Sequence, residues 1–357
     1  MPKIYVGDFA LCELFGLSAN REVSVSFTWR GFLRRGKGNP DGWGVAWYAD
    51  RRVFLVKEPR PSVKSPIARF LLSKVKGHVF ISHVRWATEG GVNYVNTHPF
   101  VRKLHDYEWV FAHNGDVSGI MGSSEFRLKY YFPVGDTDSE YAFCYIMDNL
   151  RELGEEVSSI IKTSKIIWEL ANKIGDYGKF NFLLSNGEYL FSYMNRSGTL
   201  HYLLRHPPHR GYVKLEDEDF EVRLEEIKGP DEFAALIATK PLTSENWVPF
   251  ELGCLYVFSS GDILLKVNGQ GRLEHTLSSI EVEVLRLIRT SPRSVKLAFL
   301  SRELELSLNE AYSAVRMLVA KGFLRQDRRY PVPMDSPEAR FFTEPRRREV
   351  IDLVILE

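Results

Sequence analysis

The 357-residue chain contains few cysteines and no long apolar run. Its three cysteines, Cys12, Cys144 and Cys254, lie far apart and form no Cys-x-x-Cys pair, which argues against a disulfide framework and a zinc site. No apolar run reaches the roughly 18 residues that a membrane span requires, and the first residues lack the charged-then-apolar layout of a secretory signal. We therefore expect a protein of the reducing cytoplasm, with no membrane partner and with no metal or other cofactor.

An excess of charge of one sign is also absent. The chain has 47 Lys and Arg against 46 Asp and Glu, a net charge of +1. This balance excludes an overall polyanion-binding surface, although it says nothing about local patches. A composition of 44% hydrophobic and 26% charged residues is typical of a globular chain with a full core, and the length predicts two domains or one large one.

Cys12 is followed by the short apolar run Leu14-Phe15. A thiol in mid-chain has a pKa of about 8.5 and needs a neighbouring base, whereas an N-terminal cysteine carries its own, an α-amino group with a pKa of about 8. Cys12 can act as a nucleophile if it becomes the first residue, either by removal of residues 1–11 or because Leu11 is the true start and is trimmed. The alternative is a small buried hydrophobe, as most free cysteines are.

The order of secondary-structure signals is strands, two central helices, then strands again. Pro66 after Ser65 opens one earlier helix, at the position where a missing N–H costs nothing. Such an order predicts an α+β architecture of four layers. The expected elements are a hairpin of 44–48 with 52–56, a helix over 67–75, strands over 78–84 and 109–112, helices over 141–150 and 158–174, and strands between 179 and 267.

Six motifs in this order resemble a class II glutamine amidotransferase, of the stand-alone bacterial and archaeal type. The resemblance covers Cys12 to about Asp262 and implies the N-terminal nucleophile hydrolase fold, an αββα sandwich. The motifs are Cys12-Glu13-Leu14-Phe15-Gly16, Asp41-Gly42-Trp43-Gly44, Ser82-His83-Val84-Arg85-Trp86-Ala87-Thr88, Asn96-Thr97-His98-Pro99-Phe100, Phe111-Ala112-His113-Asn114-Gly115 and Asp136-Thr137-Asp138-Ser139-Glu140.

The resemblance assigns the chemistry to three residues. Cys12 resembles the family's nucleophile, with its freed amine relaying the proton. Asn114, through its side-chain amide, and Gly115, through its backbone N–H, match the oxyanion hole. Read without the resemblance, Asn114-Gly115 after a strand is a turn signal.

The same resemblance implies a site for the substrate's amino-acid head. Arg85 matches the residue that pairs with the α-carboxylate and Asp138 the one that pairs with the α-ammonium, which suits the charge of each group. Trp86 and Thr88 are expected to line the same site. Asp138 also has a simpler interpretation as a helix cap. Glu89 departs from the histidine usual in synthase-linked relatives, which leaves the substrate-side loop open.

Two histidines lie within the motifs. We interpret His98 and His113 as structural or substrate-loop residues rather than bases, because the amine of Cys12 would already fill that role.

The C-terminal part has a different composition and predicts a separate helical module. Ser278 with Glu281 and Ser307 with Glu310 are capping boxes that open two helices, and a short helix is expected between them over 296–304. Three helices with a tight second turn, ending at Gly322, resemble a winged helix-turn-helix. The expected boundaries are an N-terminal extension over 1–11, the amidotransferase domain over 12–268, the winged-helix-like domain over 277–330 and a tail over 331–357 that forms a wing or a strand.

In a DNA-binding module of this kind, Asn309, Tyr312, Ser313 and Arg316 are expected to face outward from the third helix. Residues 279–330 contain ten Lys or Arg against six Asp or Glu, a net charge of +4 that is modest for a DNA binder. Winged helices also serve as packing and dimerisation modules, so a homodimer stays open as an alternative.

Two functions therefore compete. The first is an enzyme that hydrolyses the γ-amide of glutamine or of a γ-glutamyl compound through a cysteinyl thioester, with the ammonia taken up by a partner protein or simply released. The second is an amino-acid-sensing regulator, in which the hydrolase domain is a receptor and the C-terminal helices bind DNA. The complete set of site residues favours the enzyme, because a receptor has no need of a nucleophile.

Overall fold

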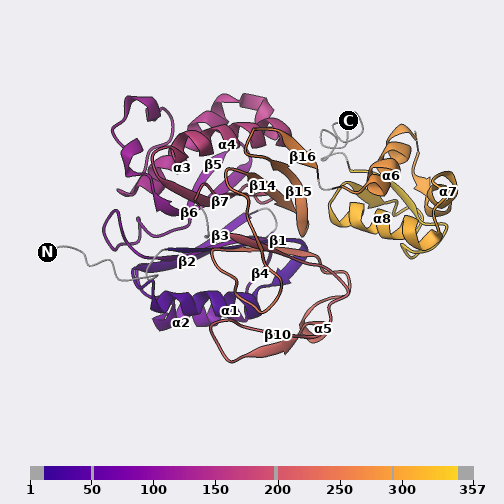
Figure 1. Ribbon diagram of the computed structural model, residues 1–357, viewed down its shortest axis with the longest axis horizontal. Helices are drawn as coiled ribbons and strands as arrows, with labels where there is room; N and C mark the ends of the chain where they lie inside the picture. The colour runs from indigo at the N-terminus through magenta and orange to yellow at the C-terminus, as the bar shows by residue number, and fades with distance from the viewer. Residues whose placement is uncertain (1–11, 50–51, 197–199, 276, 292, 345–357) are drawn as a thin grey trace.

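The computed structural model describes residues 12–49, 52–196, 200–275, 277–291 and 293–344. The expected N-terminal extension, residues 1–11, and the end of the tail, residues 345–357, lie outside these ranges. Two seven-stranded antiparallel sheets pack face to face between two layers of helices, and a smaller helical module follows them (Figure 1). This confirms the predicted αββα sandwich. No helix among the described residues is both long and apolar enough to cross a membrane.

The first sheet carries β1 at its centre. Its strand order is β13-β9-β12-β1-β4-β2-β3, so the N-terminal strand lies between strands from distant parts of the chain. The predicted hairpin is confirmed as β2 and β3. The strands are β1 (Glu13–Ser24), β2 (Gly42–Ala49), β3 (Arg52–Glu58), β4 (Lys76–Arg85), β9 (His201–Arg205), β12 (Ala234–Ala238) and β13 (Val248–Pro249).

The second sheet has the order β16-β15-β14-β8-β7-β6-β5. The turn interpretation of Asn114-Gly115 is wrong, because both residues lie inside β6 and pair with Asn181 and Phe180 of β7. The strands are β5 (Phe100–Leu104), β6 (Tyr107–Asp116), β7 (Lys179–Ser185), β8 (Leu190–Tyr193), β14 (Leu255–Ser259), β15 (Asp262–Val267) and β16 (Leu273–His275).

Three helices of the described sandwich begin at side-chain caps that the sequence supplies. Ser65 accepts a hydrogen bond from the Ala68 N–H ahead of α2, and Thr137, not Asp138, caps α3 by accepting from the Glu140 N–H. The capping interpretation of Asp138 is therefore wrong. The elements are α1 (Ser26–Arg34), α2 (Pro66–Leu72), α3 (Asp138–Glu152), α4 (Ile160–Gly175), α5 (Leu224–Ile227), the hairpin β10 (Tyr212–Lys214) and β11 (Glu221–Arg223), and 3-10 turns at Arg35–Lys37, Ser62–Lys64, Ser118–Ile120, Ser124–Phe126 and Gly154–Ser158.

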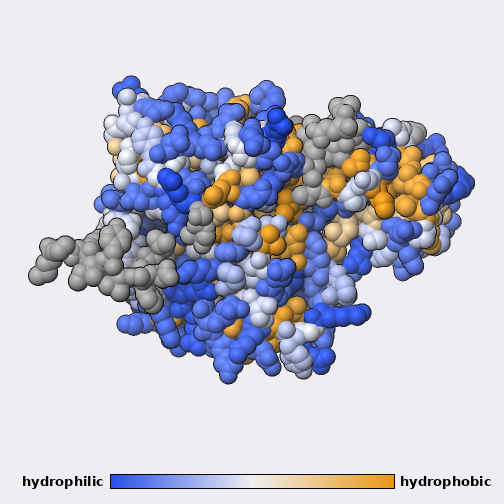
Figure 2. Space-filling model, in the orientation of Figure 1, coloured by the Kyte–Doolittle hydropathy of each residue, from blue (hydrophilic) through white to orange (hydrophobic). Residues whose placement is uncertain are grey.

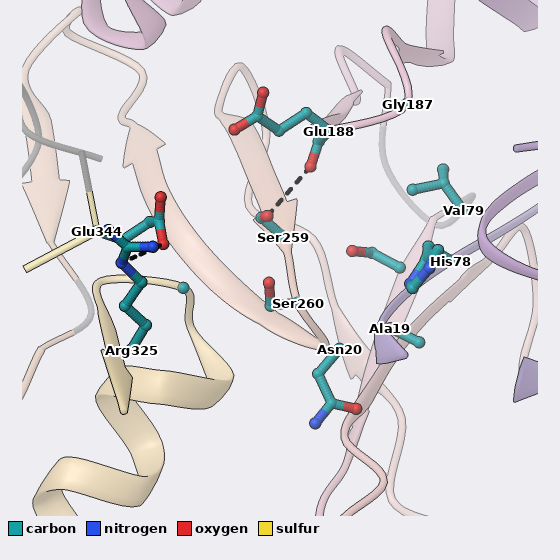
Figure 3. Close-up of a pocket in the computed structure, with 12 residues that line it drawn as sticks. Ala19, Asn20, His78, Val79, Gly187, Glu188, Ser259, Ser260, Arg325 and Glu344 are labelled. Atoms are coloured by element: carbon teal, nitrogen blue, oxygen red, sulfur yellow. Dashed lines mark hydrogen bonds and ion pairs between the residues drawn. The ribbon is translucent and has the colours of Figure 1, made fainter. Parts of the chain in front are cut away.

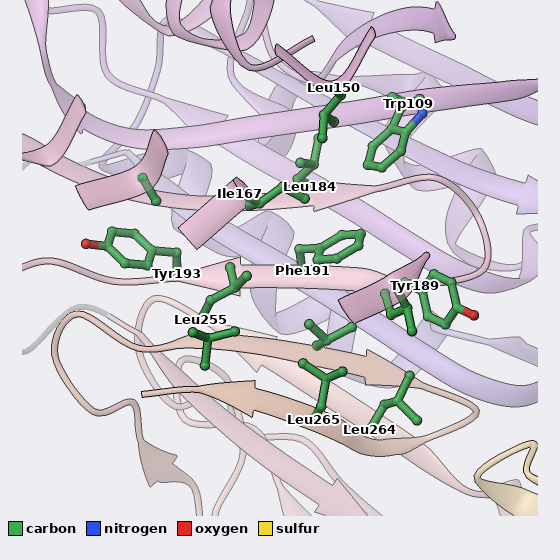
Figure 4. Close-up of a cluster of buried hydrophobic side chains, with 14 of the residues drawn as sticks. Trp109, Leu150, Ile167, Leu184, Tyr189, Phe191, Tyr193, Leu255, Leu264 and Leu265 are labelled. Carbon is green, nitrogen blue, oxygen red and sulfur yellow. The ribbon is translucent and has the colours of Figure 1, made fainter. Parts of the chain in front are cut away.

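Three apolar layers hold the sandwich together. Successive residues of β1 point to opposite faces, so Leu14 packs between the two sheets while Phe15 packs toward α1 and α2. The third layer lies between the second sheet and helices α3 and α4, where Trp109, Phe191 and Ile167 meet (Figure 4). Burial of these side chains fixes the two sheets relative to each other, and so it also fixes the strand ends at their shared edge.

The C-terminal module is the predicted helix-turn-helix, with both capping boxes formed. Its three-stranded sheet, in the order β17-β19-β18, includes residues 340–343 of the tail, which form the returning strand of a wing. On the face that Figure 2 shows, hydrophobic residues gather over this module, whereas the sandwich surface is mostly hydrophilic. The elements are α6 (Ser279–Thr290), β17 (Val295–Lys296), α7 (Leu297–Glu303), α8 (Leu308–Ala320), β18 (Leu324–Gln326) and β19 (Arg340–Thr343).

The module contacts the sandwich through the C-terminal end of α8. The ammonium group of Lys321 lies 3.6 Å from a carboxylate oxygen of Asp262 in β15 and 3.0 Å from one of Glu281 in α6, and all three side chains are buried. The guanidinium of Arg316 lies 5.5 Å from the ring centre of Phe233 in the sandwich. The expectation that Arg316 faces outward is therefore wrong. Asn309 and Ser313 are exposed, whereas Tyr312 is half-buried against the core.

Replacing Lys321 with alanine should destabilise the protein strongly, because the carboxylates of Asp262 and Glu281 would stay buried without their cation. Loss of one member of a buried charged group costs about 3–5 kcal/mol. The matched control is Lys296→Ala, which removes an exposed ion pair with Glu338 and should cost about 0–1 kcal/mol. Urea denaturation followed by circular dichroism measures both values. An equal loss of unfolding free energy in the two variants would contradict the buried contact of Lys321 with Asp262 and Glu281.

Candidate active site

The site begins at Cys12, the residue directly before β1. Its sulfur accepts a hydrogen bond from the backbone N–H of Trp86, with a separation of 3.2 Å. Burial raises the pKa of the Cys12 thiol to about 11, although the Trp86 N–H and the charge of Arg85 act in the opposite direction. A thiol with a pKa of about 11 is almost entirely protonated at neutral pH, and the thiolate is the reactive form.

The end of β4 supplies the wall around this sulfur, and Asp41 holds that wall in place. The backbone N–H of Asp41 donates to the carbonyl of Arg85 at 3.0 Å, and the Asp41 carboxylate accepts from the backbone N–H of Ala87 at 2.8 Å. Trp86 lies between these two anchored residues. Asp41 therefore positions the N–H that contacts the Cys12 sulfur.

Arg85, expected to bind the substrate carboxylate, already has acceptors. Its guanidinium donates to the backbone carbonyls of Glu89 at 2.7 Å, Gly91 at 3.0 Å and Gly90 at 3.3 Å. These three carbonyls belong to the loop that follows β4. A carboxylate ligand at this side of Arg85 would compete with these carbonyls for the guanidinium.

Asn114 and Gly115 come from the second sheet. The side-chain amide of Asn114 donates to the backbone carbonyl of Cys12, which joins β6 to the start of β1, and its amide oxygen is buried without a partner among the described residues. A Cβ atom on Gly115 would collide with the carbonyl oxygen of Lys179, so only glycine fits there. The side-chain amide of Asn114 and the backbone at Gly115 thus lie next to Cys12.

Asp138, at the first position of α3, is buried beside the same site. One carboxylate oxygen accepts from the N–H of Val117 at 2.7 Å, and the other accepts from the N–H of Ser139 at 2.7 Å and from the Ser139 hydroxyl at 3.2 Å. Backbone N–H groups of two segments, Val117 after β6 and Ser139 in α3, therefore hold the carboxylate in one orientation. A carboxylate oxygen can accept two hydrogen bonds, which leaves the oxygen facing Val117 with room for an ammonium.

A single cavity joins these residues. Its volume is only about 20 Å³, roughly one water molecule, so it cannot hold an amino acid in this conformation. The cavity and the Asn114 contact together account for every residue that the sequence predicted for the site. The lining includes Cys12, Arg85, Trp86, Thr88, Glu89, His98, His113, Gly115, Thr137, Asp138 and Ser139.

The histidines beneath the cavity are buried and poorly basic. His83 and His98 stack with ring centres 4.3 Å apart, and none of their ring nitrogens has a partner among the described residues. Burial lowers the pKa of His83 to about 3 and lowers that of His98 well below its usual value. His113 contacts the Ser139 hydroxyl at 2.8 Å, and burial lowers its pKa as well. Neutral, weakly basic rings fit a structural role rather than proton transfer at Cys12.

Two positioning residues were not predicted from the sequence. Asp41 lies in the Asp-Gly-Trp-Gly motif, where only the glycines drew attention. Asn96 is fully buried; its side chain donates to the Gly91 carbonyl at 3.1 Å and to the Asp136 carboxylate, so it ties the loop after β4 to the segment before α3. The motif Asn-Thr-His-Pro-Phe was the available signal. Within the described residues, no cluster of histidine, cysteine and carboxylate side chains could hold a metal ion.

Comparison with known protein families finds two profiles that match adjacent parts of the chain. The profile of the family described as glutamine amidotransferases class-II matches residues 11–281. The profile described as the IclR helix-turn-helix domain matches residues 282–328. The two matches together span all of the site residues and the three helices of the module.

Individual relatives agree with these profiles. An uncharacterized protein of Methanocaldococcus jannaschii is 39% identical over 96% of this chain and 96% of its own length. A candidate glutamine amidotransferase of Escherichia coli is 35% identical over 71% of this chain and 99% of its own length. The crystal structure of a predicted glutamine amidotransferase from Pseudomonas aeruginosa is 32% identical, with a TM-score of 0.54 over 71% of this chain and 99% of that one.

The raised thiol pKa predicts how Cys12 should react with iodoacetamide. In the full 357-residue chain, a pKa of about 11 leaves roughly one thiol in 10⁴ ionised at pH 7, so the alkylation rate should rise about tenfold per pH unit up to pH 10. Mass spectrometry of the peptide that contains Cys12 measures this rate. In a chain that starts at Cys12, the free amine should shift the rise toward neutral pH. A rate in the full chain that is already at its plateau at pH 7 would contradict the raised pKa.

Proposed function

Because the chain belongs to the class II glutamine amidotransferases, we propose that it hydrolyses the γ-amide of glutamine or of a γ-glutamyl compound, with Cys12 as the nucleophile. The observation that carries this proposal is the convergence at Cys12. A cysteine before the central strand shares one small cavity with Arg85 and Asp138, while Asn114 holds its backbone carbonyl. This arrangement combines a nucleophile, an amide donor and two opposite charges for an amino-acid head.

The first step requires a free α-amine on Cys12. That amine takes the thiol proton, and the thiolate attacks the γ-carbonyl carbon to give a tetrahedral intermediate. Collapse of this intermediate breaks the C–N bond, and the protonated amine gives its proton to the leaving nitrogen, so that ammonia or an amine departs. A cysteinyl thioester remains. The same amine then takes a proton from water, whose oxygen attacks the thioester carbonyl. The C–S bond breaks, the γ-carboxylate is released, and the Cys12 thiolate takes the proton back from the amine.

Asn114 and Gly115 are the proposed oxyanion hole. The negative oxygen of the tetrahedral intermediate forms next to Cys12, and a side-chain amide and a backbone N–H can both donate to it. Before the reaction, the Asn114 amide donates to the Cys12 carbonyl. This contact supports the assignment, because it holds the amide beside Cys12 before substrate binds, and the amide has a second N–H that can donate to the oxyanion.

In this mechanism, binding of the substrate's amino-acid head to Arg85 and Asp138 opens the loop after β4. The α-carboxylate of the substrate replaces the carbonyls of Glu89, Gly90 and Gly91 as the hydrogen-bond acceptor of the Arg85 guanidinium. The α-ammonium approaches Asp138. The displaced loop enlarges the cavity, whose present volume of about 20 Å³ is too small for glutamine. Trp86 and Thr88, which flank Ala87 in the anchored segment, then line the substrate.

Removal of the Asn114 amide should lower turnover with little change in binding of the amino-acid head. In a chain that starts at Cys12, Asn114→Ala should reduce kcat by about 10²- to 10³-fold, because one oxyanion donor is lost. Ammonia release from glutamine and from a panel of γ-glutamyl amides measures this effect, and Cys12→Ala gives the background. Unchanged turnover of the best substrate in a folded Asn114→Ala variant would refute the assignment. If none of the compounds is turned over, the proposed hydrolase activity is refuted.

A second candidate function is DNA binding by the module, so that the protein acts as an amino-acid-sensing regulator. The match to the IclR helix-turn-helix profile supports it, together with the surface of the module. Asn309 and Ser313 are exposed at the N-terminal half of α8, the part of a recognition helix that reads base edges. Arg328 and Arg329 are exposed after β18, where a wing contacts phosphates.

DNA binding of this kind should fall steeply with salt and should depend on the wing. Replacing Arg328 with alanine should weaken binding to mixed genomic fragments at all sequences and lower the salt slope by about one. Fluorescence anisotropy at several salt concentrations measures both. The control is Arg302→Ala, which removes an exposed arginine that pairs with the neighbouring Glu303 on α7. Binding that is absent or independent of salt would leave the module as a packing element only.

A further inference from the structure

We propose that the cavity between the sandwich and the C-terminal module is a binding site for a free α-amino acid, distinct from the site at Cys12. The cavity has a volume of about 430 Å³, which lies within the range of small-molecule sites. One wall comes from the sandwich and the other from the module, and ligand sites occur preferentially at such domain junctions.

The two walls carry different polar groups (Figure 3). Arg325 of β18 and Glu344 lie on the side of the module, opposite Ser259, Ser260 and Asn20 on the sandwich. The sandwich side also includes His78, in β4, and Glu188, in the turn between β7 and β8. Charged groups of both signs therefore surround one polar space.

Several of these groups have spare binding capacity. The guanidinium of Arg325 is half exposed, and its ion pair with Glu344 is long, at 3.7 Å. Within the described parts of the chain, the carboxylate of Glu188 and the imidazole of His78 make no hydrogen bond or ion pair. The Ser260 hydroxyl is likewise available beside them. A charged side chain without a partner that lines a cavity of this size is available to contact a ligand.

The chemistry of these groups favours a zwitterion. An arginine fork suits a carboxylate, and the carboxylate of Glu188 suits an ammonium. The hydroxyl of Ser260 and the imidazole of His78 can accept or donate to a polar side chain. A free amino acid presents a carboxylate for Arg325 and an ammonium for Glu188, whereas a dicarboxylate would leave Glu188 without a partner and a diamine would leave Arg325 with Glu344 alone.

The cavity shares its walls with the contacts that hold the module. Ser260 lies two residues before Asp262, the carboxylate that contacts Lys321, and Lys321 directly precedes Gly322 in the opposite wall. The turn around Gly261 is tight, because a Cβ there would collide with the backbone of Phe233, the ring beneath Arg316. A ligand in the cavity therefore touches segments next to both interdomain contacts and would bias the orientation of α8.

The test is isothermal titration calorimetry of the full chain with L-glutamate and L-glutamine as probes. At least one of them should bind, and succinate, which lacks the ammonium, should bind at least about tenfold more weakly. Arg325→Gln and Glu188→Gln should each raise Kd about tenfold or more, since each removes one charge-assisted contact. The matched control is Arg302→Gln, an exposed arginine on α7 outside the cavity, which should leave Kd unchanged.

Hydrogen exchange provides a second readout. On binding, the amides of Gly322 to Gln326 and of Ser259 to Gly261 should become protected. Two outcomes would overturn the proposal: no binding of either probe at about 10 mM, or binding that Arg85→Gln abolishes and Arg325→Gln leaves unchanged, because the catalytic cavity would then be the only site. Failure of the hydrolase proposal would appear instead as absent turnover in the chain that starts at Cys12, with binding between the domains unaffected.

Discussion

The hydrogen bond from the Asn114 amide to the Cys12 carbonyl joins the two sheets at the edge where the site forms. Cys12 precedes the central strand of one sheet, and Asn114 lies near the end of β6 in the other. The apolar layer between the sheets, which includes Leu14 and Val110, sets the separation that this bond needs. That fixed separation therefore gives Cys12 and the Asn114 amide a defined geometry relative to each other.

Close backbone approach is the second requirement at this edge. Gly115 lies against the carbonyl of Lys179, and Gly44 lies against that of His98, so neither position admits a side chain. These two glycines allow β6 and β2 to approach their neighbours closely enough to position the segments that surround Cys12. The glycines of the motifs thus serve packing of the site rather than flexibility.

The order of the layers and the residues of the site could be predicted from the sequence. The contacts that those residues make were harder to predict. Periodicity and capping residues identified β4, α3 and both capped helices of the module, because local patterns determine these elements. The turn interpretation of Asn114-Gly115 was wrong because pairing of β6 with β7 overrides a local turn preference. Neither the three carbonyls around Arg85 nor the role of Asp41 could be predicted, since both depend on contacts between segments far apart in the chain.

The backbone carbonyls that surround Arg85 compete with a substrate carboxylate for hydrogen bonds from its guanidinium. In the resting conformation the loop after β4 satisfies the guanidinium, so a ligand gains only the difference between its own contacts and those it replaces. On the proposed function, a molecule without a carboxylate would gain nothing by displacing the loop, and the closed loop leaves only about 20 Å³ beside Cys12. The loop would thereby set a threshold for entry that disfavours amides without an amino-acid head.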